Sequence, residues 1–263
     1  SRLVCIARAS SFVSGIGLVF GVLREVSVAY GYGASWSSDA FFVAMIPVTL
    51  AAALGGDLGL AMLPFYVRSR MINGLADANA FFDRARRRVA IAGVAGVVIV
   101  VATSAFWVPV VAPGLPADVQ RDTTRLLWVL APGVALIMPA MLWQARANAH
   151  HRFVLPQAVQ QAPNIGVIIG ALVLSSLGVV GLGVGQSFGF VAQGLLMWSV
   201  SRVDTTGIQS GMRTTPLRGF WIVWVCVIAG SLTSKVELFL QRYYGSGLGA
   251  GEISSLNYAQ RFS

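Results

Sequence analysis

The sequence predicts an all-α polytopic membrane protein, and three features of the chain lead to that fold class. Of its 263 residues, 56% are hydrophobic and 11% are charged, whereas ordinary soluble domains carry about 25% charged residues. Several apolar runs reach roughly 20 residues, the length that a helix needs to cross about 30 Å of hydrocarbon. The runs are also continuous, unlike the alternating segments of about ten residues that form membrane β-barrels.

Seven apolar runs reach spanning length, and each is expected to form a helix. In chain order they cover about residues 10–31, 40–66, 89–111, 124–143, 154–177, 179–201 and 217–241, and an eighth opens near Gly249. We therefore expect about seven to eight transmembrane helices. The chain begins at Ser1 without a Met and stops just inside the eighth pattern, so we expect a fragment whose C-terminal remainder is missing. The first run is too long for a cleavable signal.

Each run carries its own local signals. The first contains glycines that permit close helix packing, and the second is headed by Asp39 and interrupted by "LGGDLG". The third follows an arginine-rich segment, and the fourth follows the proline-rich turn "APGLPADVQRDTTR". The fifth contains Pro163, a residue that bends helices, and the sixth is rich in glycine. Six tryptophans lie near run ends, as in an aromatic belt: Trp107, Trp128, Trp143, Trp198, Trp221 and Trp224.

The basic residues of the loops predict the topology. With the N-terminus taken as cytoplasmic, thirteen arginines fall in inside segments and three in outside segments, and this strict alternation follows the positive-inside rule. The inside arginines are Arg2, Arg8, Arg68, Arg70, Arg84, Arg86, Arg87, Arg88, Arg146, Arg152, Arg202, Arg213 and Arg218; the outside ones are Arg121, Arg125 and Arg242. The net charge of +9 thus marks loops facing lipid headgroups. It does not indicate nucleic-acid binding, because no aromatic residues are interleaved with the basic ones.

Catalytic and metal-binding classes have no support in the sequence. There is no nucleotide-binding glycine loop and no GxSxG elbow. Cys5 and Cys226 are single and distant, which argues against a disulfide or metal site. His150 and His151 are adjacent in a short loop without nearby ligand partners, so we expect a solvated pair. The sequence therefore predicts a transporter with no enzymatic centre and no bound metal.

Charges at membrane depth are the main functional signal, because they are costly there and usually face a protein interior or a water-filled path. The charged candidates are Arg24, Glu25, Asp39, Asp57, Lys235 and Glu237. Asp39 fits both a helix-capping and a functional role, since it heads its run. Arg24 either extends to the outer interface or faces a cavity.

The remaining candidates are interpreted from their neighbours in the sequence. Asp57, within "LGGDLG", is expected to mark a kink or an unwound segment lining a cavity. Lys235 and Glu237 are two residues apart, so they point about 200° away from each other on a helix, and one of them needs a partner elsewhere. Asn164 follows Pro163, where a kink or an interhelical hydrogen bond is more common than contact with a ligand.

Three phrases together resemble one family. "LREVSVAYGYGASWSSDAFFVAMIP" resembles the opening of the MviN/MurJ family of lipid II flippases, which shows an "RD…A…FG…DAFFVAF..P" pattern. "NAHHRFVLP", followed by "PNIGVIIGAL", is similar to the family's "NAYGRFALP" with its later "LNI". "GSGLGAGEISSLNYAQRF" resembles the family's "LGxGxISALNYAxRL". The three matches keep their order and spacing and cover nearly the whole chain.

The resemblance implies a multidrug/oligosaccharidyl-lipid/polysaccharide exporter fold of about fourteen helices in two lobes. Residues 1–202 would form the N-terminal lobe with about six helices, and residues 203–263 would begin the second lobe with helix seven and the start of helix eight. The family implies transport of an undecaprenyl-linked peptidoglycan precursor, lipid II, across the bacterial inner (plasma) membrane by alternating access. It also implies coupling to the membrane potential or an ion gradient, with no cofactor. Partners would be the lipid-linked anionic glycan, membrane lipids and wall-synthesis proteins.

Site residues are carried over on the matching motifs. Arg24, Asp39 and Arg261 fall on the family's functional Arg, Asp and Arg of helices one, two and eight, and Glu237 falls where many members have the Asp of "VDR". Arg24 and Arg261 would attract the pyrophosphate, and Asp39 would pair with an arginine in the empty state. Glu25, Asp57, Lys235 and Asn164 are further cavity candidates.

Two departures from the family keep more than one function open. The family's additional Arg in "SRxLGFxRD" is missing from "GLVFGVLRE", and "NLLRRLFAEGA" becomes "VTLAAALGGDLG", which lacks both arginines. The substrate could therefore be a related polyprenyl-linked glycan. A cation-coupled drug exporter of the same superfold and a non-transporting scaffold of a wall-synthesis complex also fit, because intramembrane charges suit all of these functions.

Overall fold

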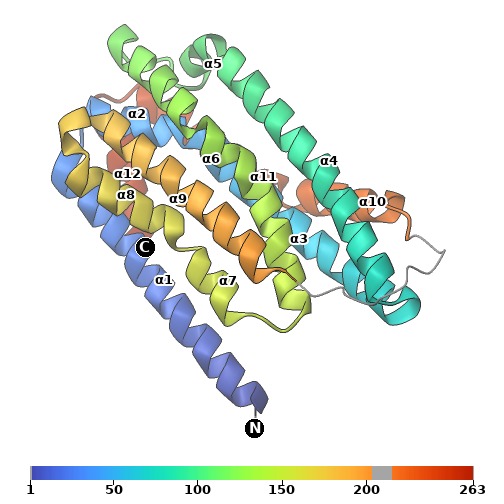
Figure 1. The fold of residues 1–263 in the computed structure, drawn as a ribbon. Helices are drawn as coiled ribbons and strands as arrows, with labels where there is room; N and C mark the ends of the chain where they lie inside the picture. Colours follow the sequence, from blue (N-terminus) through green and yellow to red (C-terminus); the bar gives the residue numbers. More distant parts are fainter. Residues whose placement is uncertain (1, 203–214, 263) are drawn as a thin grey trace.

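The protein is an elongated bundle of helices packed side by side (Figure 1). The computed structural model describes residues 2–202 and 215–262, and within them the side chains of all residues except 2–10, 232–235, 238, 261 and 262. The residues that the structure describes are 87% helical and contain no strand. The predicted all-α class is confirmed.

The helices follow one another with short connections. Their bounds are α1 (Arg2–Tyr32), α2 (Trp36–Ala44), α3 (Ile46–Asn73), α4 (Leu75–Ala102), α5 (Ser104–Val111), α6 (Ala117–Ala149), α7 (Val154–Val159), α8 (Ala162–Val173), the 3₁₀ helix η1 (Ser175–Leu177), α9 (Val179–Val200), α10 (Arg218–Gly230), α11 (Leu232–Ser246) and α12 (Glu252–Phe262).

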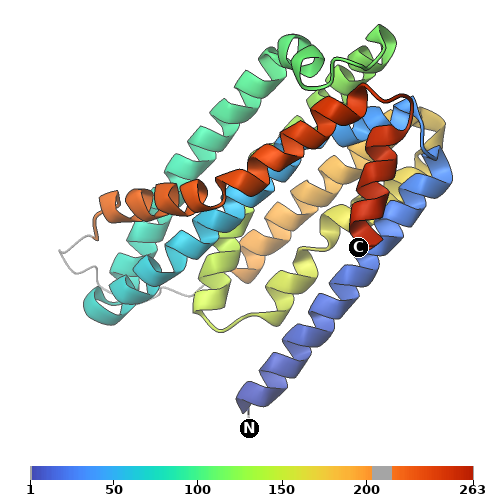
Figure 2. The ribbon, with the colours of Figure 1, turned by 180° about the vertical axis from the view of Figure 1, so that it is seen from behind.

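The connections gather at two opposite ends of the bundle. One end, here called the arginine-rich end, holds Gly74 and the segments 150–153 and 215–217; the other, the arginine-poor end, holds the segments 33–35, 112–116 and 247–251 together with Gly178 (Figures 1 and 2). The helical segments therefore run alternately between the two ends. This is the antiparallel order that the charge alternation in the sequence requires.

Four helical segments of the described chain are long and apolar enough to cross a membrane singly: 11–32, 36–73, 117–149 and 179–200. A fifth span is present if α4 and α5 count together, although they are bent by 75° at Thr103. Helix α10 is a shorter apolar helix. The protein is a multi-pass membrane protein. The predicted number of seven to eight transmembrane helices exceeds these four or five spans, because the other predicted runs fold as shorter or broken helices.

Four predicted continuous runs are broken, and one of them is the run 89–111, at the bend between α4 and α5. The run 154–177 divides into α7, α8 and η1, because Pro163 has no N–H to donate to the carbonyl of Val159, so α7 ends there and a new helix starts at Ala162. The run 217–241 divides at Ser231, between α10 and α11. The second run is broken at Met45, whereas α3 continues through Asp57, so the kink expected at that aspartate is absent.

Packing is tightest where α8 meets α9, because glycines face each other. A Cβ at Gly166 would lie 2.2 Å from the carbonyl oxygen of Gly185, and one at Gly185 would lie 2.1 Å from that of Gly166. Backbone contact at this distance leaves no room for a side chain. Around this pair, one apolar core contains Phe41, Leu130 and Leu182, and a second, beside the α3–α4 connection, contains Tyr66, Phe81 and Phe220.

Candidate functional site

Asp39 joins the second helix of the chain to the last one. Ser35 and Ser38 already form a capping box at the start of α2, so the carboxylate of Asp39 is not needed there. The side chain is fully buried. It accepts hydrogen bonds from the backbone N–H of Gly251 at 2.7 Å and of Ser254 at 2.8 Å. Asp39 therefore caps α12 from a distant part of the sequence, and its negative charge opposes the positive end of that helix dipole.

The start of α12 fits closely against the α1–α2 connection. Gly251 has φ +83°, and a Cβ on it would lie 2.5 Å from the carbonyl carbon of Ala34, so both conformation and space require glycine. The Tyr258 hydroxyl donates to the Gly33 carbonyl at 3.3 Å, and its ring packs edge-on against Phe42 with centroids 5.7 Å apart. These residues, 33–42 and 251–258, form a contact called here the α2–α12 seal, at the arginine-poor end.

Arg242 lies buried beside this seal. The residue is 4% exposed, and its guanidinium donates to the side-chain oxygen of Asn257 at 2.6 Å and to the carbonyl of Ile253 at 3.4 Å. The guanidinium carbon lies 5.8 Å from the centre of the Phe42 ring. Within the described residues, its Nε has no hydrogen-bond partner. A buried cation with an unused donor thus lies at the inner side of the seal.

Arg24 pairs with its own neighbour. Its guanidinium forms an ion pair with the carboxylate of Glu25, which is 4% exposed. Glu25 lies on the buried face of α1, in line with Gly21 and Val28 at helical spacing. The second carboxylate oxygen of Glu25 and the Nε of Arg24 have no partner among the described residues. Asp39, which was expected to pair with an arginine, does not pair with Arg24: Arg24 pairs with Glu25, and Asp39 accepts backbone hydrogen bonds from the start of α12.

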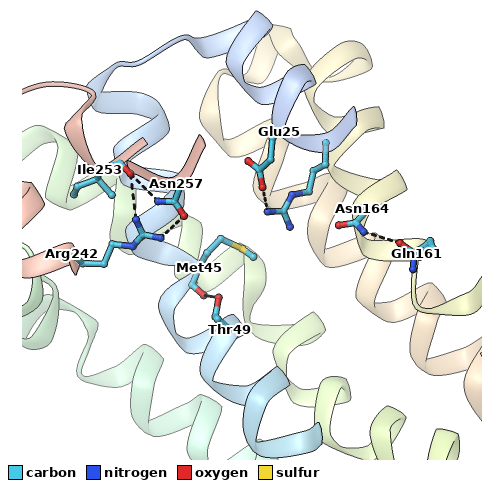
Figure 3. Close-up of polar contacts among 9 residues, drawn as sticks. Glu25, Met45, Thr49, Gln161, Asn164, Arg242, Ile253 and Asn257 are labelled. Carbon is cyan, nitrogen blue, oxygen red and sulfur yellow. Dashed lines mark hydrogen bonds and ion pairs between the residues drawn. The ribbon is translucent and has the colours of Figure 1, made fainter. Parts of the chain in front are cut away.

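Polar side chains from several helices face a common interior region (Figure 3). Glu25 points into it from α1. Arg242 and Asn257 lie on its other side, on α11 and α12. Charged groups that are far apart in the sequence therefore meet in one part of the bundle, as they do along paths through membrane proteins.

Two helix breaks border the same region. Asn164, near the start of α8, donates to Gln161 at 3.0 Å, so its partner is local to the α7–α8 break. At the α2–α3 break, the Thr49 hydroxyl donates to the Met45 carbonyl at 3.0 Å. Discontinuous helices beside paired charges are typical of transporter interiors.

Comparison with known proteins identifies the family of this chain. The family described as "Lipid II flippase MurJ" matches residues 28–263. The chain belongs to the MurJ family.

Relatives and solved structures agree with this assignment. The "Probable lipid II flippase MurJ" of Aquifex aeolicus is 23% identical over 256 residues, covering 92% of the chain and 49% of that protein. The "Lipid II flippase MurJ" of Burkholderia cenocepacia is 26% identical over 276 residues, covering 97% of the chain and 52% of that protein. The structure "Lipid II flippase MurJ, inward closed conformation" matches with a TM-score of 0.76 at 20% identity, over 96% of the chain and 54% of that structure. The chain thus spans about half the length of these MurJ relatives.

The remaining residues carried over from MurJ motifs lie in different surroundings. Glu237 is exposed and accepts a hydrogen bond from Gln241, one turn later on α11, at 2.8 Å. The side chains of Lys235 and Arg261 lie outside those that the structure describes, although their backbones belong to α11 and α12.

Asp57 lines a cavity without bending its helix. Its carboxylate accepts from the Ser231 hydroxyl at 3.0 Å, at the α10–α11 break. The cavity has a volume of about 380 Å³ and is also lined by Gln144 and Gln160. The cavity expected at Asp57 is therefore present, although the expected kink is not.

Two residues of the site were missed by reasoning from the sequence. The loop-charge pattern places Arg242 in an outside segment, because it follows the last apolar run, but the residue is buried in α11. Its partner Asn257 lies fifteen residues further on and carries no charge to attract notice. The sequence did offer one signal: Arg242 directly follows an apolar run, whereas Arg121 and Arg125 lie within the proline-rich turn.

Two of the three MurJ arginines that the sequence lacks would lie at Ala51 and Ala52 of α3. Ala52 packs against the first apolar core. Ala51 lines an apolar groove between α3, α4 and α6. Neither position adds a charge to the interior region, whose described cations are Arg24 and Arg242.

At the arginine-rich end, only one of the two histidines that were predicted to be solvated is exposed. His151 is exposed, but His150 is partly buried, with its Nε2 2.8 Å from the Tyr66 hydroxyl and its Nδ1 3.4 Å from a guanidinium nitrogen of Arg70. Burial, followed by the positive charges of Arg70, Arg146, Arg152 and His151, lowers the pKa of His150 to about 4. The imidazole is therefore neutral at physiological pH.

Proposed function

We propose that the protein is a flippase that moves an undecaprenyl-pyrophosphate-linked peptidoglycan precursor, lipid II, from the inner to the outer leaflet by alternating access. The observation that carries this proposal is the membership of residues 28–263 in the MurJ family. The proposal includes location in the bacterial inner membrane with a cytoplasmic N-terminus, and coupling to the membrane potential or an ion gradient. Residues 1–202 would be the N-terminal lobe, and residues 203–263 the start of the second lobe.

The polar groups of the interior region suit an anionic headgroup. Arg24 and Arg242 are cations with unused donors at their Nε atoms within the described residues. A pyrophosphate offers several acceptor oxygens and forms strong charge-assisted hydrogen bonds with guanidinium groups in a site of low dielectric constant. In this proposal, Glu25 holds Arg24 while the site is empty and gives it up when the pyrophosphate binds.

The α2–α12 seal suits the outer gate of such a transporter. With the N-terminus inside, the arginine-poor end faces outward, and the seal closes the bundle there through two backbone N–H groups bonded to Asp39. These bonds join helices far apart in the sequence, so they can break without unfolding either helix. Substrate shifts the inward and outward populations only to the extent that the two states hold it differently.

Complementation tests the flippase proposal. The full-length gene should restore growth when the host's own essential flippase is depleted, and Arg24→Ala should abolish the rescue. Absence of rescue by a protein that is expressed and inserted in the membrane would overturn the lipid II assignment. Rescue that survives Arg24→Ala would remove that arginine from the mechanism.

A crosslink tests the gate. The rings of Phe42 and Tyr258 are in edge-on contact, so Phe42→Cys and Tyr258→Cys together should be joined by a short thiol-reactive crosslinker in intact cells. The crosslinked protein should lose its ability to support growth, and each single cysteine variant treated in the same way should keep it. Full activity of the crosslinked protein would show that the seal does not open during transport.

One observation favours a related glycan as a second candidate substrate. The two MurJ arginines of the second helix are replaced by Ala51 and Ala52, so fewer cations are available to a pyrophosphate. Purified protein in vesicles should therefore be assayed with lipid II and with other polyprenyl-linked glycans. Wall-synthesis proteins are the expected partners in either case.

A further inference from the structure

A second apolar feature of the bundle is a groove whose lining contains none of the charged residues of the interior region. It has a volume of about 310 Å³ and lies between α3, α4, α6 and α10. Its α4 wall is made of Ala92, Gly93, Gly96, Val97, Val100 and Val101. Trp224 of α10 closes another side and donates to the Leu54 carbonyl at 3.3 Å. Gly96 opens the groove, because a Cβ there would have nothing within 4 Å.

The groove ends at a cluster of arginines. Arg88 precedes Ala92 by four residues, so it continues the groove-lining face of α4 by one turn toward the arginine-rich end. Side chains on a helix also tilt toward its N-terminus, which directs Arg88 further toward that end. Arg87 and Arg88 are exposed. Within the described residues, neither forms an ion pair, whereas Arg86 pairs with Asp83.

The dimensions of this arrangement match one half of a bilayer. From Arg88 to Val101, α4 rises roughly 20 Å, which is comparable to the length of a phospholipid acyl chain together with its glycerol group. The cationic end of the groove therefore lies at headgroup level when its apolar part lies in hydrocarbon. Charge and depth together select an occupant with a negative phosphate and a long apolar chain.

We propose that this groove binds one acyl chain of an anionic phospholipid, whose phosphate is held by Arg88. With the orientation proposed above, the lipid belongs to the cytoplasmic leaflet, where anionic headgroups attract basic residues. The site differs from the interior region in its lining, its position and its ligand, so it does not depend on which substrate is transported.

Tryptophan quenching by brominated lipid tests the proposal. Trp224 lines the groove, so a dibrominated acyl chain bound there quenches its fluorescence, and Trp224→Phe identifies that component among the other tryptophans. The full-length protein is titrated in detergent micelles with dibrominated phosphatidylglycerol or dibrominated phosphatidylcholine. We expect half-maximal quenching by phosphatidylglycerol at a mole fraction about fivefold lower than that needed with phosphatidylcholine. This is the effect of one basic residue near an anionic headgroup. Glycerol phosphate, which has no acyl chain, should not compete.

Two variants and their matched controls distinguish binding of the lipid's acyl chain from binding of its headgroup. Gly96→Leu fills the groove and should abolish quenching of Trp224, while Gly15→Leu, at a glycine that also has open space around it, should not. Arg88→Gln should raise the midpoint for phosphatidylglycerol to that for phosphatidylcholine, while Arg86→Gln, which removes the same charge two residues away, should leave most of the preference. Equal midpoints for the two lipids in the unmodified protein, or unchanged quenching in Gly96→Leu, would overturn the proposal.

Discussion

At the scale of single residues, the site depends on buried polar groups whose partners come from elsewhere in the chain. Asp39 is fully buried, and both of its oxygens accept backbone hydrogen bonds from the start of α12. Arg242 of α11 is buried nearby and bonds to Asn257 of α12. A buried charge is costly unless it is bonded, so replacing either group should affect stability more than replacing a surface charge.

Asp39→Asn should weaken the α2–α12 seal. The amide keeps one acceptor oxygen, but its NH₂ group faces a backbone N–H that needs an acceptor, so we expect a loss of about 1–3 kcal/mol. Hydrogen exchange of residues 251–258 and the thermal unfolding of the purified protein measure this loss. Asp122→Asn is the control, because its ion pair with Arg125 is exposed and should contribute little. Equal effects of the two substitutions would contradict the capping role.

His150 predicts a dependence of stability on pH. Its pKa is lowered to about 4 in the folded protein, below the ordinary value of about 6.5. Between these values the unfolded chain binds more protons, so stability is fully present above about pH 6.5 and falls as the pH falls toward about 4. Melting temperatures measured from pH 7.5 to about 4 should show this decline in the natural protein and less of it in His150→Gln. His151→Gln, at the exposed neighbour, should leave the decline unchanged.

At the scale of elements, glycine sets how closely α8 and α9 approach. The opposed contacts of Gly166 and Gly185 bring the backbone of one helix against that of the other. This packing fixes the end of α8 nearest the interior region, where Asn164 and Gln161 lie. The α7–α8 break and the glycine contacts thus act together: the proline begins a new helix, and the glycines determine where it packs.

Gly166→Ala should therefore be destabilising. The added methyl group would lie 2.2 Å from the Gly185 carbonyl oxygen, and the backbone must move apart, which we expect to cost about 1–3 kcal/mol. Thermal unfolding in detergent measures the change. Gly15→Ala, which meets no atom within 4 Å, should be neutral or up to about 1 kcal/mol more stable through its higher helix propensity. A neutral Gly166→Ala would show that α8 and α9 can separate freely.

At the scale of the whole molecule, the last helices of the chain are attached to the first ones at both ends of the bundle. The α2–α12 seal lies at the arginine-poor end. At the arginine-rich end, the hydroxyl of Thr215, which precedes α10, donates to the Asp77 carboxylate at 2.9 Å and lies 2.9 Å from the Ser69 hydroxyl. Asp77 also accepts from Asn73 at 2.9 Å. The segment before α10 is thereby held against the α3–α4 connection. In the alternating-access mechanism proposed above, one or both of these attachments must move.

Thr215→Val should loosen the attachment at the arginine-rich end with little change in the size of the side chain. The substitution removes the hydroxyl that contacts Asp77 and Ser69, and we expect faster hydrogen exchange in residues 215–220. Thr123→Val is a suitable control, because its hydroxyl donates to the Val119 carbonyl of its own helix at 2.9 Å. Exchange that is unchanged in Thr215→Val would mean that packing alone holds this segment.

Much of the architecture could be predicted from the sequence, because hydrophobic length and loop charge act locally. Apolar runs of spanning length predicted an all-α membrane fold, and the arginines predicted which connections share an end of the bundle. The breaks at Met45, Thr103 and Ser231 were not predicted, since apolar composition is the same in a continuous helix and in two short ones. Pro163, in contrast, indicated a kink in the fifth run, and the structure breaks that run at Gln160–Gln161. The kink predicted from "LGGDLG" was wrong, because α3 continues through Asp57.

The sequence by itself determined that the protein crosses a membrane repeatedly, that its loops alternate in charge, and that Arg24, Glu25 and Asp39 are charges within or beside apolar runs. Only the tertiary structure decided their partners: Asp39 with the start of α12, Arg24 with Glu25, and the unpredicted Arg242 with Asn257. The physical reason is that membrane insertion depends on composition within one segment. The partner of a buried charge depends on helices that lie up to 215 residues apart in the chain and meet only after packing.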